Sequence, residues 1–221
     1  MEQDYILLIF NCVKYRYKAL NQKETWILDL PKNILYFHVI GDPQLTNNYL
    51  FYPSENILYV RVEDDYNSLP KKVIKAYSAI YETYKFKYIF KTDDDQMVTN
   101  MRFFDIVMNS LNKKYDDHNS RIHYGGHIVD VKQSYQSEYY RIHPELPTNL
   151  IVKITRYCSG RFYFLSNNSI EELIQKTDKI SEEFLEDYAI GYNLPAQLKT
   201  NIMSLDTNKY FIDFSCFDYV S

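Results

Sequence analysis

The sequence predicts an α/β fold in which helices flank a mixed, mostly parallel sheet. Short apolar runs of strand length recur along the first half of the chain, and segments with helical periodicity separate them. Several of these runs end in Gly, Pro or Asp, which are residues typical of turns. Strands that alternate with helices indicate a mostly parallel sheet. Ligands bind beyond the carboxyl ends of such strands, so residues that follow the apolar runs are the first candidates for a site.

Composition limits the classes of protein to which the chain can belong. With 221 residues, of which 46% are hydrophobic, it is long enough to bury a substantial core as one domain. A net charge of −4 argues against a general nucleic-acid-binding protein. The three cysteines, Cys12, Cys158 and Cys216, are too few and too scattered for a disulfide framework or a CxxC metal site. A reducing compartment is therefore the simpler expectation.

The first half of the chain contains the clearest elements. The strongest helical periodicity falls between residues 73 and 84, where apolar residues recur on one face and lysines lie on the other. A second helix is expected at Lys14–Ile27. Buried strands are expected at Tyr5–Asn11, Ile34–Ile40, Ile57–Val62 and Lys87–Lys91.

The second half continues the same alternation without a repeat, a low-complexity tract or an obvious linker. Strands are expected at Tyr124–Val131 and Arg161–Leu165. Helices are expected from Asn100 to about Leu111, at Ser169–Lys176 and at Glu183–Gly191. The short apolar run near the N-terminus fits neither a signal peptide nor a membrane span, so the chain is expected to be soluble.

Three consecutive aspartates, Asp93, Asp94 and Asp95, follow the apolar run that ends at Phe90. Carboxylates this close repel one another unless a cation or hydrogen-bond donors neutralise them. Hard oxygen ligands suit Mg²⁺ or Mn²⁺, especially when phosphate oxygens complete the coordination sphere. The alternative is a solvated loop whose aspartates cap the next helix. The residue types alone leave both interpretations open.

Six segments occur in an order that resembles a known family, the inverting β1,3-glycosyltransferases. This family includes β1,3-galactosyltransferases, β1,3-N-acetylglucosaminyltransferases and the Fringe enzymes. The resemblance covers roughly Arg16 to Gly191. The segments are Arg16-Tyr17-Lys18-Ala19 with Thr25-Trp26, Phe37-His38-Val39-Ile40-Gly41, Asp65-Tyr66-Asn67-Ser68-Leu69 with Lys72, Phe90-Lys91-Thr92-Asp93-Asp94-Asp95, Tyr157-Cys158-Ser159-Gly160 with Tyr163 and Ser166, and Glu186-Asp187-Tyr188 with Gly191.

The resemblance implies a GT-A type nucleotide-sugar transferase fold in one domain, residues 1–221. About residues 1–98 would bind the nucleotide sugar and about 99–221 the acceptor. The implied reaction moves a hexose or N-acetylhexosamine from a UDP-sugar to a hydroxyl of a glycan, glycoprotein or glycolipid, with inversion and formation of a β1,3 linkage. The family's membrane anchor and luminal disulfides are absent from the sequence, which favours a cytoplasmic enzyme encoded by a virus or microbe.

The resemblance also implies roles for the acidic residues. Asp95 would ligate Mn²⁺ or Mg²⁺, with Asp93 helping directly or through water, and Asp94 would touch the ribose or sugar of the donor. Asp187 would be the general base that deprotonates the acceptor, with Glu186 as the alternative. Without the resemblance, Glu186 and Asp187 read as the exposed face of a helix.

Four further residues are candidates for donor binding. Arg16 and Lys72 would bind or orient the nucleotide, although both also read as surface cations on helices. Ser159 and Gly160 would form a loop where backbone approaches the sugar, since glycine lacks a Cβ. Lys91, beside the aspartates, either balances their charge or is simply solvated.

Two departures from the family pattern keep other interpretations open. No histidine follows His143, whereas many members complete the metal site with one; Asp213, Asp218 or water would have to substitute. Arg161 stands where the family usually has a small residue. The alternatives are a catalytically weak descendant that keeps carbohydrate or nucleotide binding, and an Asp-rich phosphohydrolase, which would leave the later motifs unexplained.

Overall fold

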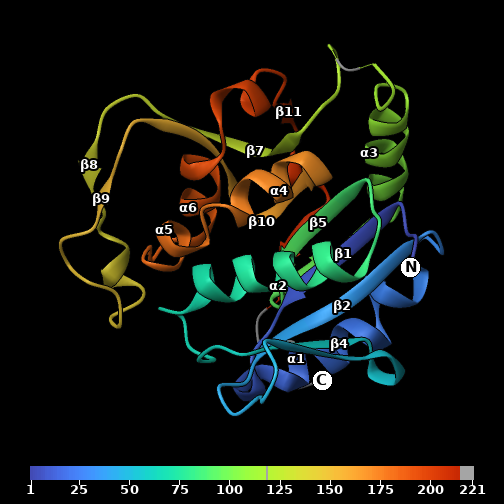
Figure 1. Ribbon diagram of the computed structural model, residues 1–221, viewed down its shortest axis with the longest axis horizontal. Helices are drawn as coiled ribbons and strands as arrows, with labels where there is room; N and C mark the ends of the chain where they lie inside the picture. Colours follow the sequence, from blue (N-terminus) through green and yellow to red (C-terminus); the bar gives the residue numbers. More distant parts are fainter. Residues whose placement is uncertain (118, 215–221) are drawn as a thin grey trace.

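A computed structural model describes residues 1–117 and 119–214, which form an eight-stranded sheet with helices on both faces (Figure 1). This confirms the predicted α/β class and is consistent with the GT-A type that the resemblance implies. The strand order is β11-β7-β10-β5-β1-β2-β4-β3. The strands are β1 (Tyr5–Phe10), β2 (Ile34–Gly41), β3 (Tyr49–Tyr52), β4 (Ile57–Val60), β5 (Tyr88–Asp93), β7 (Tyr124–Val131), β10 (Thr155–Ser166) and β11 (Met203–Ser204).

The sheet is parallel at its centre and mixed toward its ends. Strand β1 pairs in parallel with β2 and β5, and β2 pairs in parallel with β4. Strand β10 runs antiparallel to both β5 and β7. The carboxyl end of β5 therefore lies beside the middle of β10, and residues from both halves of the chain meet there.

The described residues form six α-helices, and five of them contribute to two separate apolar cores. One core joins α2, α4, α5 and α6 to one face, and the other joins α3 to the opposite face. Alternate residues of β1 enter opposite cores, as the two-residue period of a strand requires. The helices are α1 (Arg16–Glu24), α2 (Leu69–Thr83), α3 (Arg102–Asn112), α4 (Asn167–Ile174), α5 (Thr177–Ser181) and α6 (Glu186–Asn193).

Two small antiparallel pairs and six 3₁₀ turns complete the described chain. Strands β8 (Tyr135–Gln136) and β9 (Ile151–Val152) form an arm that lies away from the main sheet (Figure 1). Strand β6 (Gln96–Val98) pairs with β12 (Phe211–Asp213). The 3₁₀ turns are η1 (Val13–Tyr15), η2 (Trp26–Asp29), η3 (Pro53–Glu55), η4 (Tyr139–Arg141), η5 (Ala196–Lys199) and η6 (Thr207–Lys209).

The structure corrects one expectation about local conformation and disagrees with one alternative. Helix α1 is shorter than the expected Lys14–Ile27 helix, because Thr25 leaves the helical region and 3₁₀ turns flank it on both sides. The aspartates do not cap a helix, because Asp93 ends β5 and β6 begins three residues later, at Gln96. None of the helices in the described ranges is long and apolar enough to cross a membrane.

Strand β10 is longer than the expected Arg161–Leu165 segment, and a bulge interrupts it. Its pairing with β7 passes from Cys158 opposite Ile128 to Tyr163 opposite Gly126. The residues between Cys158 and Tyr163 therefore bulge out opposite a single residue of β7. Ser159, Gly160 and Arg161 belong to this bulge, which lies beside the end of β5.

Gly191 allows helix α6 to lie directly against β10. A Cβ at residue 191 would lie 2.2 Å from Cβ and 2.7 Å from Cα of Tyr157. We expect Gly191→Ala to lower the free energy of unfolding by about 1–3 kcal/mol, because helix and strand must move apart. Urea unfolding measures this change. A gain of about 1 kcal/mol, the usual effect of Gly→Ala inside an uncrowded helix, would contradict the close contact.

Candidate active site

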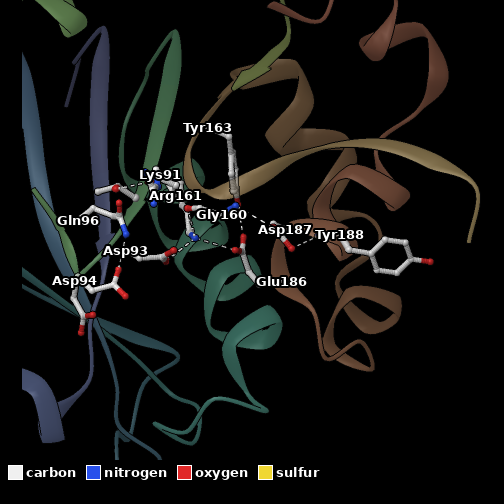
Figure 2. Close-up of polar contacts among 12 residues, drawn as sticks. Lys91, Asp93, Asp94, Gln96, Gly160, Arg161, Tyr163, Glu186, Asp187 and Tyr188 are labelled. Atoms are coloured by element: carbon white, nitrogen blue, oxygen red, sulfur yellow. Dashed lines mark hydrogen bonds and ion pairs between the residues drawn. The ribbon is translucent and has the colours of Figure 1, made fainter. Parts of the chain in front are cut away.

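A buried lysine lies at the centre of the site. Lys91 of β5 is 1% exposed. Its Nζ donates to Asp93 Oδ1 at 2.7 Å and to the carbonyl of Gly160 at 2.9 Å, and it pairs with Glu186 Oε2 at 2.9 Å (Figure 2). An ammonium group has three N–H donors, so these three acceptors satisfy it. The acceptors come from β5, the β10 bulge and α6, which join three of the motifs noted in the sequence.

Lys91 carries its charge inside the protein. Burial alone would lower the pKa of Lys91, but the carboxylates of Asp93 and Glu186 raise it above its usual range. The strand-end lysine is therefore an internal counter-ion for two carboxylates, not a solvated side chain. The interpretation that Lys91 balances charge agrees with these contacts.

Glu186 is held on both of its carboxylate oxygens. One oxygen pairs with Lys91, and the other accepts a hydrogen bond from the hydroxyl of Tyr163. That hydroxyl in turn shares a 2.7 Å hydrogen bond with the hydroxyl of Tyr77. Burial raises the pKa of Glu186, although Lys91 opposes the shift. At 5% exposure, Glu186 is part of the interior and not of the exposed helix face that residue types alone indicated.

Asp187 differs from its neighbour because it is only half-buried. Its Oδ2 accepts from the backbone N–H of Gly160 at 3.0 Å, and its Oδ1 accepts from the N–H of Tyr188 at 2.7 Å. Burial raises the pKa of Asp187, and Lys91 and the two N–H groups oppose the rise. The carboxylate is thus oriented by backbone, remains partly accessible, and is a stronger base than an exposed aspartate.

Gly160 lies between the carboxylates of Asp93 and Asp187. A Cβ added to it would lie 3.3 Å from Lys91 Nζ, 3.4 Å from Asp93 Oδ2 and 3.7 Å from Asp187 Oδ2. A side chain at this position would crowd Lys91 and contact both carboxylates, so glycine lets these three groups lie close to the backbone of the bulge. Ser159 precedes it in the bulge and is half-buried.

The aspartate triplet is divided among different partners. Asp93 contacts Lys91, Asp94 Oδ1 lies 3.1 Å from Lys18 Nζ, and Asp95 Oδ1 accepts from Gln96 Nε2 at 2.9 Å. Burial raises the pKa of Asp93 and of Asp94 to about 6 each, against the opposing charges of Lys91 and Lys18. The cluster therefore carries more negative charge than its lysines neutralise.

This donor set fits a divalent cation only when other ligands join it. Among residues 1–117 and 119–214, no group of three or more His, Cys, Asp or Glu side chains is arranged to hold a metal ion. A hard cation would nevertheless stabilise the ionised forms of Asp93 and Asp94, whose pKa values burial raises. Mg²⁺ commonly uses one or two carboxylates together with substrate phosphates and water. Asp93 and Asp95 fit that kind of site.

Asp213 lies beside the triplet. Gln96 Nε2 donates to Asp95 Oδ1 and also to Asp213 Oδ1, each at 2.9 Å. The guanidinium of Arg161 holds Asp213 through two hydrogen bonds of 2.8 and 2.9 Å. Arg161 thus fixes β12 next to the triplet, and its contacts account for a large residue at this position. Asp218, the other proposed substitute for the histidine, lies outside the described residues.

Lys72 is buried and connects α2 to the ends of two strands. It is 3% exposed, and its Nζ lies 2.6 Å from Asp64 Oδ1 and donates to the carbonyl of Asn11 at 3.0 Å. Asp64 also accepts from the backbone N–H groups of Gly41 and Val13, at 2.9 and 2.7 Å. These bonds join the carboxyl ends of β1 and β2 to α2, where the parallel strands end. Lys72 is therefore not the surface cation of the alternative interpretation.

Arg16 lies on the surface of the protein. Its Nη2 lies 3.2 Å from Glu55 Oε2, and both side chains are largely exposed. It takes no part in the cluster around Lys91. The sequence interpretation missed three residues that organise the site: Lys18, Asp64 and Gln96. Each is a common polar residue, and only the fold brings it to its partner.

Comparison with known proteins identifies the family. The galactosyltransferase family matches residues 19–205, a span that includes the triplet, the β10 bulge and the start of α6. The chain belongs to this family. The galactosyltransferase assignment agrees with the resemblance found in the sequence motifs, and it makes the chain a member of a glycosyltransferase family.

Individual proteins are less similar to this chain than the family as a whole. No curated protein matches this chain significantly. Among solved structures, the glycosyltransferase GlyE of Streptococcus pneumoniae TIGR4 is similar, with 10% identity and a TM-score of 0.45. The match covers 95% of this chain and 46% of that protein, so this chain spans about half of its length.

Proposed function

We propose that the protein is a metal-dependent inverting glycosyltransferase. It would move a hexose or N-acetylhexosamine from a UDP-sugar to an acceptor hydroxyl, forming a β1,3 linkage. The observation that carries this proposal is the pairing of two carboxylates across Gly160: Asp93 from the triplet and the half-buried Asp187. One would serve the donor and the other the acceptor, on the two sides of Gly160.

In the proposed reaction, Asp187 accepts the proton of the acceptor hydroxyl. The hydroxyl oxygen forms a bond to the anomeric carbon as the bond from that carbon to the diphosphate breaks, and attack from the opposite face inverts the configuration. The N–H groups of Gly160 and Tyr188 keep the Asp187 carboxylate oriented during this transfer. A positioned carboxylate with a raised pKa suits this role.

On the donor side, Asp93 and Asp95 would hold Mn²⁺ or Mg²⁺, which supplies Lewis-acid stabilisation of the leaving diphosphate. Asp94, held by Lys18, would touch the ribose or sugar of the donor. Lys91 keeps Asp93 in place and connects it through Gly160 to Asp187. Ser159 and Gly160 would lie against the transferred sugar.

We expect UDP release from one member of a UDP-sugar panel to require Mn²⁺ and to stop when a chelator is added. Asp95→Ala should lower that release by about 10²-fold or more, because a Lewis acid contributes several kcal/mol to the transition state. Asp105→Ala is the matched control, since Asp105 is an exposed aspartate on α3. Equal release by wild type and Asp95→Ala would reject a metal role for this residue.

The same experiment addresses the second candidate function, a carbohydrate- or nucleotide-binding module derived from such an enzyme. The division of the triplet among separate partners favours this candidate. Binding of a UDP-sugar with Mn²⁺ but without UDP release, in the presence of a broad acceptor panel, would support it. Absence of both binding and release would reject both functions.

A further inference from the structure

Gln96 is buried beside the aspartate triplet and contacts two carboxylates at once. It is the first residue of β6 and is 4% exposed. Its Nε2 donates to Asp95 Oδ1 and to Asp213 Oδ1, each at 2.9 Å. A glutamine amide carries two N–H donors, so the two carboxylates use both of them. Turning the amide over would place its carbonyl oxygen against both carboxylates, and charge repulsion therefore fixes its orientation.

Arg161 anchors the far end of this contact. Asp213 lies opposite Gln96 in the pairing of β6 with β12, so the two side chains are neighbours. Nη2 of Arg161 donates to the two oxygens of Asp213 at 2.8 and 2.9 Å, and its Nη1 donates to the carbonyl of Phe211 at 3.2 Å. Both oxygens of Asp213 are therefore engaged, and a guanidinium balances its charge. Asp213 is thus a fixed point to which Gln96 connects Asp95.

A second buried glutamine, Gln22 of α1, holds the backbone of the same turn. Asp94 and Asp95 form the turn between β5 and β6. Gln22 is 2% exposed, and its Nε2 donates to the carbonyl of Gln96 at 2.9 Å and to the carbonyl of Asp93 at 3.3 Å. These carbonyls belong to the residues on either side of the turn. One side-chain amide therefore holds both ends of the turn that carries Asp95.

These contacts act on the residue that is proposed to ligate the metal. Asp95 is half-buried, and it follows two carboxylates whose negative charges repel its own. A hydrogen bond to one oxygen fixes the side chain before a cation arrives, so less freedom is lost on binding. Hydrogen bonds of this kind to metal-binding carboxylates commonly change metal affinity by about 10–100-fold. The contact between Gln96 and Asp95 can therefore set the affinity for a cation.

We propose that Gln96, supported by Gln22, is a positioning residue that holds the Asp95 carboxylate ready for the divalent cation. Gln96 connects Asp95 to Asp213, whose charge Arg161 already balances, so Asp213 acts as an anchor and not as a metal ligand. This assignment rests on the proposed function, since it concerns the donor side of the same site.

The test measures Mn²⁺ binding directly, apart from turnover. Electron paramagnetic resonance quantifies free Mn²⁺ as it is titrated into the protein, with and without UDP. Gln96→Met keeps the length of the side chain but has no donor, and it should raise the Kd for Mn²⁺ by about 10–100-fold. UDP binding in the presence of a chelator should stay unchanged, because the role of Gln96 concerns the cation. An equal loss of Mn²⁺ and UDP binding would indicate a general disturbance and overturn the positioning role.

Three further variants sharpen the result. Gln22→Met removes the donor to the turn while keeping the Gln96 side chain, so it tests the proposal even when Gln96→Met folds poorly; it should also raise the Kd for Mn²⁺, by a smaller factor. Gln197→Met is the matched control, because Gln197 is an exposed glutamine on η5 and should leave Mn²⁺ binding unchanged. Asp213→Asn keeps an acceptor for Gln96, so it should weaken Mn²⁺ binding far less than Asp95→Ala. Thermal unfolding of each variant verifies its fold.

Unchanged Mn²⁺ affinity in a folded Gln96→Met or Gln22→Met variant would overturn the proposal, and so would the absence of Mn²⁺ binding by wild type. A loss in Asp213→Asn as large as that in Asp95→Ala would make Asp213 a ligand and overturn its role as an anchor. UDP release from UDP-sugars reports separately on the proposed function. Mn²⁺ binding that depends on Gln96, found in a protein that releases no UDP, would support the positioning role while rejecting the transferase. Mn²⁺-dependent UDP release together with an Mn²⁺ affinity that ignores Gln96 would do the reverse.

Discussion

Asp187→Asn is expected to lower turnover by about 10²–10⁴-fold, the usual contribution of a general base. An asparagine fits the same space but cannot accept the acceptor's proton. It keeps one oxygen for the backbone N–H groups of Gly160 and Tyr188, so one of the two hydrogen bonds is lost. That loss costs about 1 kcal/mol of unfolding free energy, which leaves the protein folded.

The pH dependence of turnover gives an independent check on Asp187. The carboxyl group must be ionised to act as a base, and burial raises its pKa above the usual range of aspartate. Wild-type turnover should therefore fall as the pH decreases through that raised pKa. The residual activity of Asp187→Asn should lack this acid limb. An unchanged acid limb in the variant would show that another group accepts the proton.

Glu186→Gln is the matched comparison for Asp187→Asn. Glutamine keeps an acceptor for Tyr163 but removes the negative charge that faces Lys91. Its main effect should therefore be on stability, with a smaller loss of turnover than Asp187→Asn shows. If Glu186→Gln lost as much turnover as Asp187→Asn while remaining stable, the role of base would pass to Glu186.

Lys91→Met is expected to lower the free energy of unfolding by about 3–5 kcal/mol, because it leaves buried carboxylates without their cation. Lys91 is 1% exposed and serves both Asp93 and Glu186. Turnover should fall as well, since Gly160 loses the bond that fixes its carbonyl while its N–H orients Asp187. Urea unfolding and UDP release measure the two effects.

Two controls separate charge from packing at Lys91. Lys87→Met removes a lysine of the same segment whose ion pair with Asp4 is solvent-accessible, and it should cost about 0–1 kcal/mol. Adding Glu186→Gln to Lys91→Met removes one unpaired charge and should recover part of the stability without restoring turnover. Equal stability of Lys91→Met and Lys87→Met would contradict the role of internal counter-ion.

The long elements were predictable because their signals are local. The buried strands β1, β2 and β5 each begin with an apolar run, and their predicted boundaries lie within two residues of the observed ones. Helix α2 shows a helical period that does not depend on its partners. The short strands β6, β11 and β12 have two or three residues each, too few to show a period, and pairing with distant segments defines them.

The sequence indicated most residues of the candidate site but not the contacts that they make with one another. The motifs brought Asp93, Gly160 and Asp187 to attention, and their catalytic and ligand roles remain predictions. From the sequence, Arg16 and Lys72 had the same two interpretations, nucleotide binding or a surface cation. The sequence does not distinguish them, because burial of a charge depends on partners that only the fold supplies. In the fold, Lys72 is buried in an ion pair with Asp64, whereas Arg16 lies on the surface.

The β10 bulge also determines which way the strand faces on each side of it. Side chains alternate in a regular strand, so residues five positions apart should point to opposite faces. Cys158 and Tyr163 are five positions apart, yet both enter the core beneath α2 and α6, because the bulge reverses the alternation. Insertion or deletion of one residue between them would turn one half of β10 over. The length of this segment therefore decides which side chains enter the core as much as their identity does.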